Sequence, residues 1–497
     1  MKLKKASLVT IALVAVTLIA SLFGFQAFFA KGVIAPTLEW SRTFGGSGND
    51  GGNYVIQTSD NGYALAGFQT ISGNNHDFYL AKTDASGTLV WSRTYGGIGI
   101  DDAYCVIETS DEGYALTGFT NSSGAGNYDG WLVKVDSSGN MQWNKTYGGA
   151  TADDLYTIIQ TPDNGYVLSG YTTSFGAGAA DGRLIKVDSS GNLLWSQTYG
   201  GTGVDDIISM TKTKDGGYAL VGFTRSYSVG GTDFWLAKVD SQGNLQWNKT
   251  YGGTADDSAH SVVQTDDDGF ALAGFTSSFG SGDRDFWLVK VDSQGNMQWN
   301  KTFGGSGSDD AVSLITTNDG SYVLVGSTTS YGAGNSDIWV VKADSNGSLL
   351  WNQTLGGSGA DYACKIIQTS EGGYALIGNT ASFGVSGTDT YFIKLAPENP
   401  SSSPTQSPTN NPTTAPSQTP IQTHNTSPTA KPTAPSSPTP TTPTTHPSPA
   451  PTPSTSPIPT ETTQAKDQEN PIVLYIIAAG IAFALLGATV FFLKKKH

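Results

Sequence analysis

The stretch from Trp143 to Leu194, WNKTYGGATADDLYTIIQTPDNGYVLSGYTTSFGAGAADGRLIKVDSSGNLL, decides the fold of this chain. Its β-branched, aromatic and aliphatic residues form short runs, which turn sequences such as Asp-Asn-Gly and Asp-Ser-Ser-Gly-Asn separate. Apolar residues do not recur at the spacing of an amphipathic helix. The stretch therefore predicts four short antiparallel strands joined by tight turns.

This unit is one copy of a tandem repeat that fills residues 37–396. In the second copy we expect strands near Ala103–Thr109, Tyr114–Thr120, Gly130–Asp136 and Met141–Tyr147. Copies of four antiparallel strands predict an all-β, seven-bladed β-propeller, with a linear β-solenoid as the alternative. The tryptophan that opens each copy recurs at intervals of 51 or 52 residues: Trp40, Trp91, Trp143, Trp195, Trp247, Trp299 and Trp351.

The phase of the repeat predicts how the ring closes. Thr37–Phe44 matches a fourth strand that no first three strands precede. The last copy begins at Asp361 and ends after its third strand, at Tyr391–Leu395. We therefore expect Thr37–Phe44 to complete the last blade, a match that a solenoid does not require.

The segments outside the repeat predict where the protein resides. Residues 1–30 place lysines before an apolar run, which is typical of an export signal, either cleaved or kept as an anchor. Most of the 22 prolines lie in residues 397–470 among Thr and Ser, which predicts an extended, disordered stalk. Residues 472–493 lack charge and would span about 33 Å as a helix, and the lysines of residues 494–497 favour a cytoplasmic tail. We expect a single-pass protein of the cell membrane, with the propeller and stalk outside the cell.

Charge and cysteine content exclude some classes of protein. The chain has 27 Lys and Arg against 42 Asp and Glu, so its net charge of −15 makes nucleic acid a poor partner.

Two Cys and five His exclude a Cys-rich metal framework or a disulfide-stapled miniprotein. Cys105 and Cys364 occur in the second and seventh copies, with one blade between them. We expect both to be free, buried thiols, because a disulfide needs Cα atoms within about 7 Å.

The repeat resembles that of a family of cell-surface proteins. Its pattern, WxKTYGGxxxDD…QTxDGGYxLxGxTxSFGxGxxDxWLxKxDxxGNxxW, is similar to the β-propeller repeats of archaeal and bacterial surface proteins. The similarity covers nearly all of residues 37–396. It implies a propeller fold and an extracellular setting, and it implies no single activity.

Several residues are the same in every copy. An Asp lies ten residues after each of the seven repeated tryptophans: Asp50, Asp101, Asp153, Asp205, Asp257, Asp309 and Asp361. A second Asp opens the third strand: Asp77, Asp129, Asp181, Asp233, Asp285, Asp337 and Asp389. A Lys follows it by five residues: Lys82, Lys134, Lys186, Lys238, Lys290, Lys342 and Lys394. An aromatic stripe, which we expect to pack between blades, is also fixed: Tyr63, Tyr114, Tyr166, Tyr218, Phe270, Tyr322 and Tyr374.

Both Asp sets should lie on the face that the blade-to-blade loops form, because the first and third strands of a blade start there. We favour a structural role, in which each Asp caps loop N–H groups or pairs with the repeated Lys. An acidic crown that binds Ca²⁺ or a cationic partner is the alternative. No cofactor is otherwise expected.

Ligand contacts are expected where the copies differ, in the loops between the second and third strands. The candidate residues are His76, Tyr128, Arg183, Arg225, Asp283 and Arg284. Arg183 stands where the other copies have Trp or Tyr. The candidate N-glycosylation sites, each in an Asn-x-Ser/Thr triplet, are Asn121, Asn144, Asn248, Asn300, Asn346, Asn352 and Asn425.

Enzyme functions find little support. The turn Val135–Trp143 resembles the Trp-docking repeats of quinoprotein dehydrogenases, but the sequence lacks the vicinal cysteines of those enzymes. The same turn loosely resembles the Asp boxes of sialidases, but the sequence lacks the Arg cluster that a sialidase needs. Thr265–Gly274 resembles a Ca²⁺ loop but lacks the later acidic ligand, which favours an ordinary turn. We predict a surface binding or adhesion protein that recognises a glycan or a protein. A structural envelope component, or an enzyme acting on extracellular polysaccharide, is the alternative.

Overall fold

The computed structural model describes residues 34–73 and 75–398, and every regular element in them is a β-strand. The first fourteen strands are β1 (Leu38–Phe44), β2 (Gly51–Gln57), β3 (Tyr63–Ser72), β4 (Asn75–Thr83), β5 (Leu89–Tyr95), β6 (Asp101–Glu108), β7 (Tyr114–Thr120), β8 (Asp129–Val135), β9 (Met141–Tyr147), β10 (Asp153–Gln160), β11 (Tyr166–Thr172), β12 (Asp181–Val187), β13 (Leu193–Tyr199) and β14 (Asp205–Lys212). The remaining strands are β15 (Tyr218–Thr224), β16 (Asp233–Val239), β17 (Leu245–Tyr251), β18 (Asp257–Gln264), β19 (Phe270–Thr276), β20 (Asp285–Val291), β21 (Met297–Phe303), β22 (Asp309–Thr316), β23 (Tyr322–Thr328), β24 (Asp337–Ala343), β25 (Leu349–Leu355), β26 (Asp361–Gln368), β27 (Tyr374–Thr380) and β28 (Asp389–Leu395).

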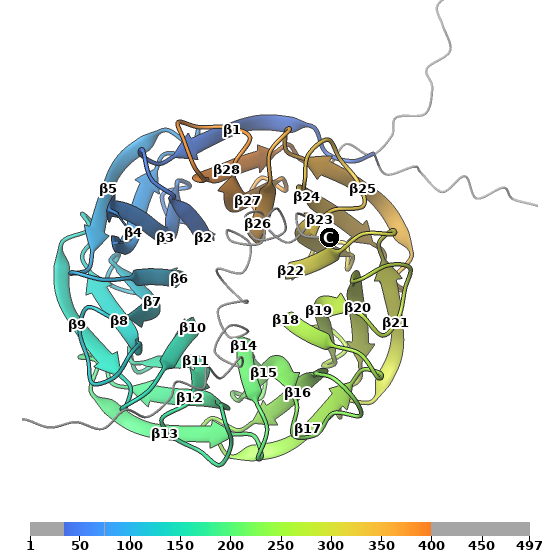
Figure 1. Ribbon diagram of the computed structural model, residues 1–497, viewed down its shortest axis with the longest axis horizontal. Coiled ribbons are helices and arrows are strands. Elements are labelled where there is room, and N and C mark those ends of the chain that lie inside the picture. The colour runs from blue at the N-terminus through green and yellow to red at the C-terminus, as the bar shows by residue number, and fades with distance from the viewer. Residues whose placement is uncertain (1–33, 74, 399–497) are drawn as a thin grey trace, which may run out of the picture. The chain divides into compact units, whose positions relative to one another are not determined.

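The strands form seven four-stranded antiparallel sheets, which confirms the seven-bladed β-propeller. Figure 1 shows the blades around a central axis, with the first strand of each blade innermost and the fourth strand outermost. We number the blades from the one that begins at β2. The bounds predicted for the second copy agree with β6–β9 to within two residues.

Ring closure follows the prediction from the repeat phase. Strand β1 pairs with β28 and completes the sheet of β26, β27 and β28. Trp40 lies opposite Lys394, and Phe44 lies opposite Thr390. The N-terminal strand therefore holds the seventh blade to the start of the chain through backbone hydrogen bonds.

Other predicted segments lie outside the described residues. They are the signal of residues 1–30, nearly all of the stalk, the membrane span of residues 472–493 and the tail. Within residues 34–73 and 75–398, no helix is long and apolar enough to cross a bilayer.

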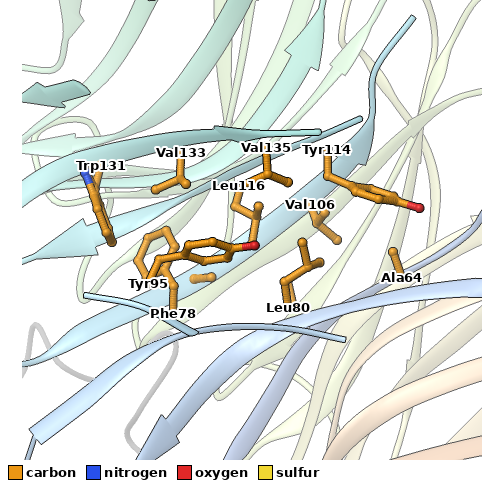
Figure 2. Close-up of a cluster of buried hydrophobic side chains, with 12 residues drawn as sticks. Ala64, Phe78, Leu80, Tyr95, Val106, Tyr114, Leu116, Trp131, Val133 and Val135 are labelled. Carbon is orange, nitrogen blue, oxygen red and sulfur yellow. The ribbon is translucent and has the colours of Figure 1, made fainter. Parts of the chain in front are cut away.

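The hydrophobic core consists of layers between neighbouring blades. Figure 2 shows one layer, in which Phe78 and Leu80 of the first blade face Val106 and Trp131 of the second. The aromatic stripe contributes to such layers. The ring of Tyr114, for example, meets Trp91 of the preceding blade edge to face, at a centroid distance of 6.0 Å, which confirms the predicted packing role.

A second contact joins the blades near their outer edge. Trp91 covers Gly139, in the turn between the third and fourth strands of the next blade; Gly139 has a φ of 78°, and a Cβ there would lie 2.7 Å from the indole. The hydroxyl of Tyr95 donates a hydrogen bond of 2.7 Å to the Gly139 carbonyl. The repeated Trp and Gly are therefore parts of one junction between blades.

Candidate functional site

The repeated Asp residues lie at the blade junctions on the loop face, as predicted. In the first set, the carboxylate accepts a hydrogen bond from the second Gly of the preceding Gly pair; the Gly149 N–H lies 2.8 Å from Asp153 Oδ2. In the second set, Asp129 Oδ2 accepts from the N–H groups of Ala125 and Gly126. These carboxylates therefore cap loops. Among the described residues, no group of three or more His, Cys, Asp or Glu side chains is arranged to hold a metal ion.

The predicted pairing of these Asp residues with the repeated Lys is wrong. Five residues of extended chain carry the Lys about 16 Å away, toward the opposite face. There each Lys pairs with the acid of its own first hairpin turn: Lys82–Asp60, Lys134–Asp111, Lys186–Asp163, Lys238–Asp215, Lys290–Asp267, Lys342–Asp319 and Lys394–Glu371. The candidate Ca²⁺ loop, Thr265–Gly274, contains one of these turns, between β18 and β19.

Two of the predicted loop residues reach a carboxyl group of the next blade. His76 stacks on Phe68 and places Nδ1 3.7 Å from Asp102. Arg284 lies over the ring of Phe275 and 3.4 Å from Asp310. Both side chains are thus held against the loop-face end of the innermost strands.

The other predicted loop residues differ in accessibility. Arg183 is only 4% exposed and donates to Ser196 Oγ and to the Tyr147 carbonyl, so its side chain is engaged inside the blade. Tyr128 is half-buried, and Arg225 and Asp283 are exposed. Ligand contacts by these residues stay predictions.

The candidate glycosylation sites are mostly at the outer rim. Asn144, Asn248, Asn300 and Asn352 share one position on the outermost strands, and all but the half-buried Asn248 are exposed. Asn144 Oδ1 accepts a hydrogen bond of 3.2 Å from Trp131 Nε1, and the corresponding bonds occur at Asn300 and Asn352. Asn121 and Asn346 are exposed loop residues, and Asn425 lies outside the described residues.

The cavity at the centre of the ring was not predicted. It has a volume of about 450 Å³, and residues of the innermost strands line most of it. Each innermost strand carries a β-bulge at its fourth residue, counted from the repeated Asp, and such bulges re-aim side chains. All seven bulged residues line the cavity: Asn53, Tyr104, Tyr156, Ile208, His260, Val312 and Cys364.

The bulged position is one of the most variable positions of the repeat, and this is the signal that sequence reasoning missed. The preceding position is Gly, Ala, Leu or Ile in every copy, whereas the bulged position carries six different residue types. A repeated glycine on the second strand accompanies the bulge. A Cβ at Gly118 would lie 1.9 Å from the Asp102 carbonyl oxygen, so only glycine fits there.

The cavity wall has an apolar and a polar sector. Blades three to six contribute Ile208, Met210, Val262 and Leu314, among other aliphatic side chains. His260 lies in this sector with Nδ1 3.0 Å from a backbone carbonyl, and burial lowers its pKa to about 4, so the ring is neutral at pH 7.

The polar sector comes from blades seven and one. Lys365, on β26, extends its ammonium over the Tyr54 ring, 4.9 Å from the centroid. Burial lowers the pKa of Lys365, an effect that the nearby Cys105 opposes. Lys365 and Lys212 line the cavity, and no described Asp or Glu does. The wall is therefore cationic in a chain whose net charge is −15.

Four buried carboxyl groups form an acidic collar between the cavity and the loop face: Asp102, Asp154, Asp206 and Asp310. Burial raises the pKa of Asp154 well above its usual value, and the charges of Asp206 and Asp102 add to this effect. Burial also raises the pKa of Asp206 to about 7. Asp102 and Asp310 face His76 and Arg284, whereas no ion pair involves Asp154 or Asp206 within the described part of the chain.

Both cysteines are free, as predicted, and Cys105 is buried. Cys364 is half-buried rather than buried, because it is the bulged residue of its strand and borders the cavity. Burial raises the pKa of Cys364 to about 12, so its thiol is neutral at physiological pH.

Comparisons with known proteins do not assign this chain to a family. No family model matches the chain. The regulatory protein FlaEY of Caulobacter vibrioides is 26% identical over 283 residues, which cover 50% of this chain and 29% of FlaEY. The chain thus spans less than a third of that relative.

Solved structures with a similar arrangement have low identity. Sqt1 from Chaetomium thermophilum (12% identity, TM-score 0.42) is covered over 99% of its length and 72% of this chain. A protein of unknown function from Dyadobacter fermentans has 14% identity and a TM-score of 0.42, and the match covers 99% of that protein and 73% of this chain. The β-propeller domain of the Trilobed protease from Pyrococcus furiosus has 7% identity and a TM-score of 0.39, and the match covers 94% of that domain and 72% of this chain. At these values, none of them bears on function.

Proposed function

We propose that this chain is a surface recognition protein whose propeller head binds a small ligand in its central cavity. The observation that carries the proposal is the set of seven bulged residues. The fold repeats its junction residues in every blade, yet the residues that the bulges turn toward the cavity vary in size and polarity. A volume of about 450 Å³ and a mostly apolar wall with a few polar groups are typical of small-molecule sites.

The surface location rests on the sequence outside the described residues. Residues 1–30 support export, residues 472–493 support a single membrane span, and residues 397–470 support a stalk that lifts the head from the membrane. The resemblance to archaeal and bacterial surface repeats supports the same setting. Residues 32–396 contain 18 Lys and Arg against 38 Asp and Glu, a net charge of −20 that disfavours nucleic acid. Proteinase K should therefore remove the head from intact cells and spare a cytoplasmic marker; protection of the head would contradict this location.

Nile red, a neutral dye whose emission reports an apolar environment, tests the cavity as a binding site. The full-length protein should bind it saturably. The double variant Ile208→Phe/Val312→Phe fills the cavity and should abolish this binding, because both side chains line the wall. The control Ile98→Phe changes a residue that is 98% exposed and should have no effect. Equal dye binding by the filled variant would refute the cavity as the site.

A glycan on the loop face is a second candidate, and one observation favours it. Five blades present an aromatic ring at the same loop position, each 43–45% exposed: Phe175, Tyr227, Phe279, Tyr331 and Phe383. Half-exposed rings with a fixed orientation suit partners that are partly apolar, as the faces of sugars are. A glycan array should show binding that the variant Phe279→Ala/Tyr331→Ala loses and the cavity-filled variant keeps.

A further inference from the structure

We infer that the ligand of the central cavity is an organic anion, a carboxylate with an apolar body, and that its carboxylate contacts Lys365 Nζ. The inference rests on the proposed function of the cavity and specifies the ligand. Three features of the structure support it: the unpaired lysine, the absence of acids from the wall and the apolar opposite sector.

Lys365 differs from the repeated lysines in its partners. Each repeated Lys pairs with a turn acid of its own blade; Lys394, on the same blade as Lys365, pairs with Glu371. Within residues 34–73 and 75–398, Lys365 Nζ has no hydrogen-bond or ion-pair partner, and it lies 4.9 Å from the centroid of the Tyr54 ring. Lys365 is half-buried and borders the cavity, so its ammonium is available to an anion that enters.

Among the residues that the structure describes, none near Lys365 supplies an anion. Its neighbour Cys364 is a neutral thiol, and the buried thiol of Cys105 also has a raised pKa. The collar carboxyl groups lie nearer the loop face and are not part of the cavity wall. Lys212, the second lysine of the wall, stands at the opposite end of its strand. An anion entering the cavity therefore meets positive charge without a competing carboxylate.

The apolar part of the cavity wall indicates that the rest of the ligand, beyond its carboxylate, is apolar. Ile208, Val262 and Leu314 belong to blades four to six, whereas Lys365 belongs to blade seven. A ligand that spans the cavity would place its charged end on Lys365 and its apolar body against these side chains. A carboxylate on a hydrocarbon chain has this form, whereas a free inorganic anion would leave the apolar sector empty.

Titration calorimetry with octanoate and its neutral analogue octanamide tests the inference on the full-length protein. We expect wild type to bind octanoate about tenfold or more tightly than octanamide, since hydrogen bonds to a charged group are the stronger ones. Lys365→Met should remove this preference. Lys365→Arg should keep the preference, and Lys212→Met, which removes the other wall lysine, should lower it by less than Lys365→Met.

The outcomes separate this inference from the proposed function. Equal binding of octanoate and octanamide by wild type, with saturable binding of Nile red, would overturn the anion and leave the cavity as a site. Failure of all three probes to bind would overturn both. The melting temperature of Lys365→Met guards against misfolding. Without ligand it should equal or exceed that of wild type, because Lys365 Nζ makes no hydrogen bond or ion pair with the described residues that the change would remove. A lower melting temperature would indicate a structural lysine and contradict the inference.

Discussion

At the scale of single residues, Asp206 has a carboxyl group whose pKa burial raises to about 7, against an opposing hydrogen bond from the Ile207 N–H. An unfolded Asp titrates near pH 3.9, so between about pH 4 and 7 the folded state keeps a proton that the unfolded state has lost. Stability contributed by this group therefore falls as pH rises through that window. We expect Asp206→Asn to raise the free energy of unfolding by on the order of 1–3 kcal/mol at about pH 8 and to lose this advantage near pH 4. A gain that does not vary with pH in denaturant melts would contradict this.

Asp215 provides a matched control of opposite sign. Its hydrogen bond from Lys238, together with that from Thr213, lowers its pKa to about 2. Its contribution to stability is therefore present above about pH 4 and is lost as pH falls through about 2. The Asp215 side chain is 56% exposed, so we expect Asp215→Asn to destabilise the head by under about 1 kcal/mol at neutral pH. The same melts should show this loss shrinking in acid.

The sequence predicted which residues repeat better than it predicted their partners. The capping role of Asp129 and Asp153 followed from their place at the start of strands. The partner of each Lys did not, because an extended strand separates residues five apart, and only the three-dimensional hairpin brings Lys238 beside Asp215. Lys365 was also missed, since a strand lysine has no unusual sequence context until the cavity around it is known.

At the scale of elements, strand positions were predictable because turn sequences bound every run. The bulges were not, since a bulge is a property of two paired strands. The irregular fourth position of strands such as β6 and β26 was visible in the sequence, but a variable position on an innermost strand has no meaning before the ring is built. The candidate site was therefore placed in the loops, whereas the cavity lies beneath them.

The junction between Trp91 and Gly139 allows an element-scale prediction. Gly139→Ala should destabilise the head by more than about 1 kcal/mol, because the residue has a φ of 78° and its new Cβ would lie 2.7 Å from the indole. Gly216→Ala is the control: its φ is 88°, but nothing lies within 4 Å of a Cβ there. The difference in free energy of unfolding between the two variants measures the steric contacts with Trp91 and with Arg93, whose Cγ would lie 2.9 Å from the new Cβ. Equal losses would show that the Trp does not press on the turn.

Strand β1 allows a second prediction at this scale. It contributes the whole outer edge of the seventh blade, and Trp40 packs edge to face on Phe392 at 5.0 Å. Deleting residues 32–44 should therefore lower the melting temperature by more than ten degrees, roughly what a loss of several kcal/mol produces in a domain of this size. A deletion of residues 399–411, beyond the described part of the chain, is the control. A melting temperature within a few degrees of the intact protein would contradict closure by β1.

At the scale of the whole molecule, the structural residues and those of the proposed recognition sites occupy different positions of the same repeat. Residues that are fixed in every copy form the junctions, the turns and the caps, so the ring stays regular. Residues that vary face the cavity or the loop surface, where no neighbouring blade constrains them. A net charge of −20 over residues 32–396 belongs largely to the fixed positions, and whether this charge binds divalent ions is the remaining question at this scale.

Ca²⁺ should not stabilise the head. It needs six to eight oxygen ligands, whereas each junction offers two carboxylates, and one oxygen of Asp129 and one of Asp153 are already bonded to loop N–H groups. The other oxygen of each has no hydrogen-bond partner among the described residues. The backbone of Gly148 packs directly against the Asp129 carboxylate, since a Cβ at Gly148 would lie 1.7 Å from Asp129 Oδ1.

We therefore expect melting temperatures in millimolar Ca²⁺ and in chelator to agree within about two degrees, because a ligand raises stability only by binding the folded state. Asp153→Asn/Asp205→Asn provides the control, since both side chains keep an oxygen to cap their loops. A rise of about ten degrees in Ca²⁺ that this variant abolishes would replace the capping role with a metal site. Agreement between the two melts would support the capping role of the repeated carboxylates at the junctions.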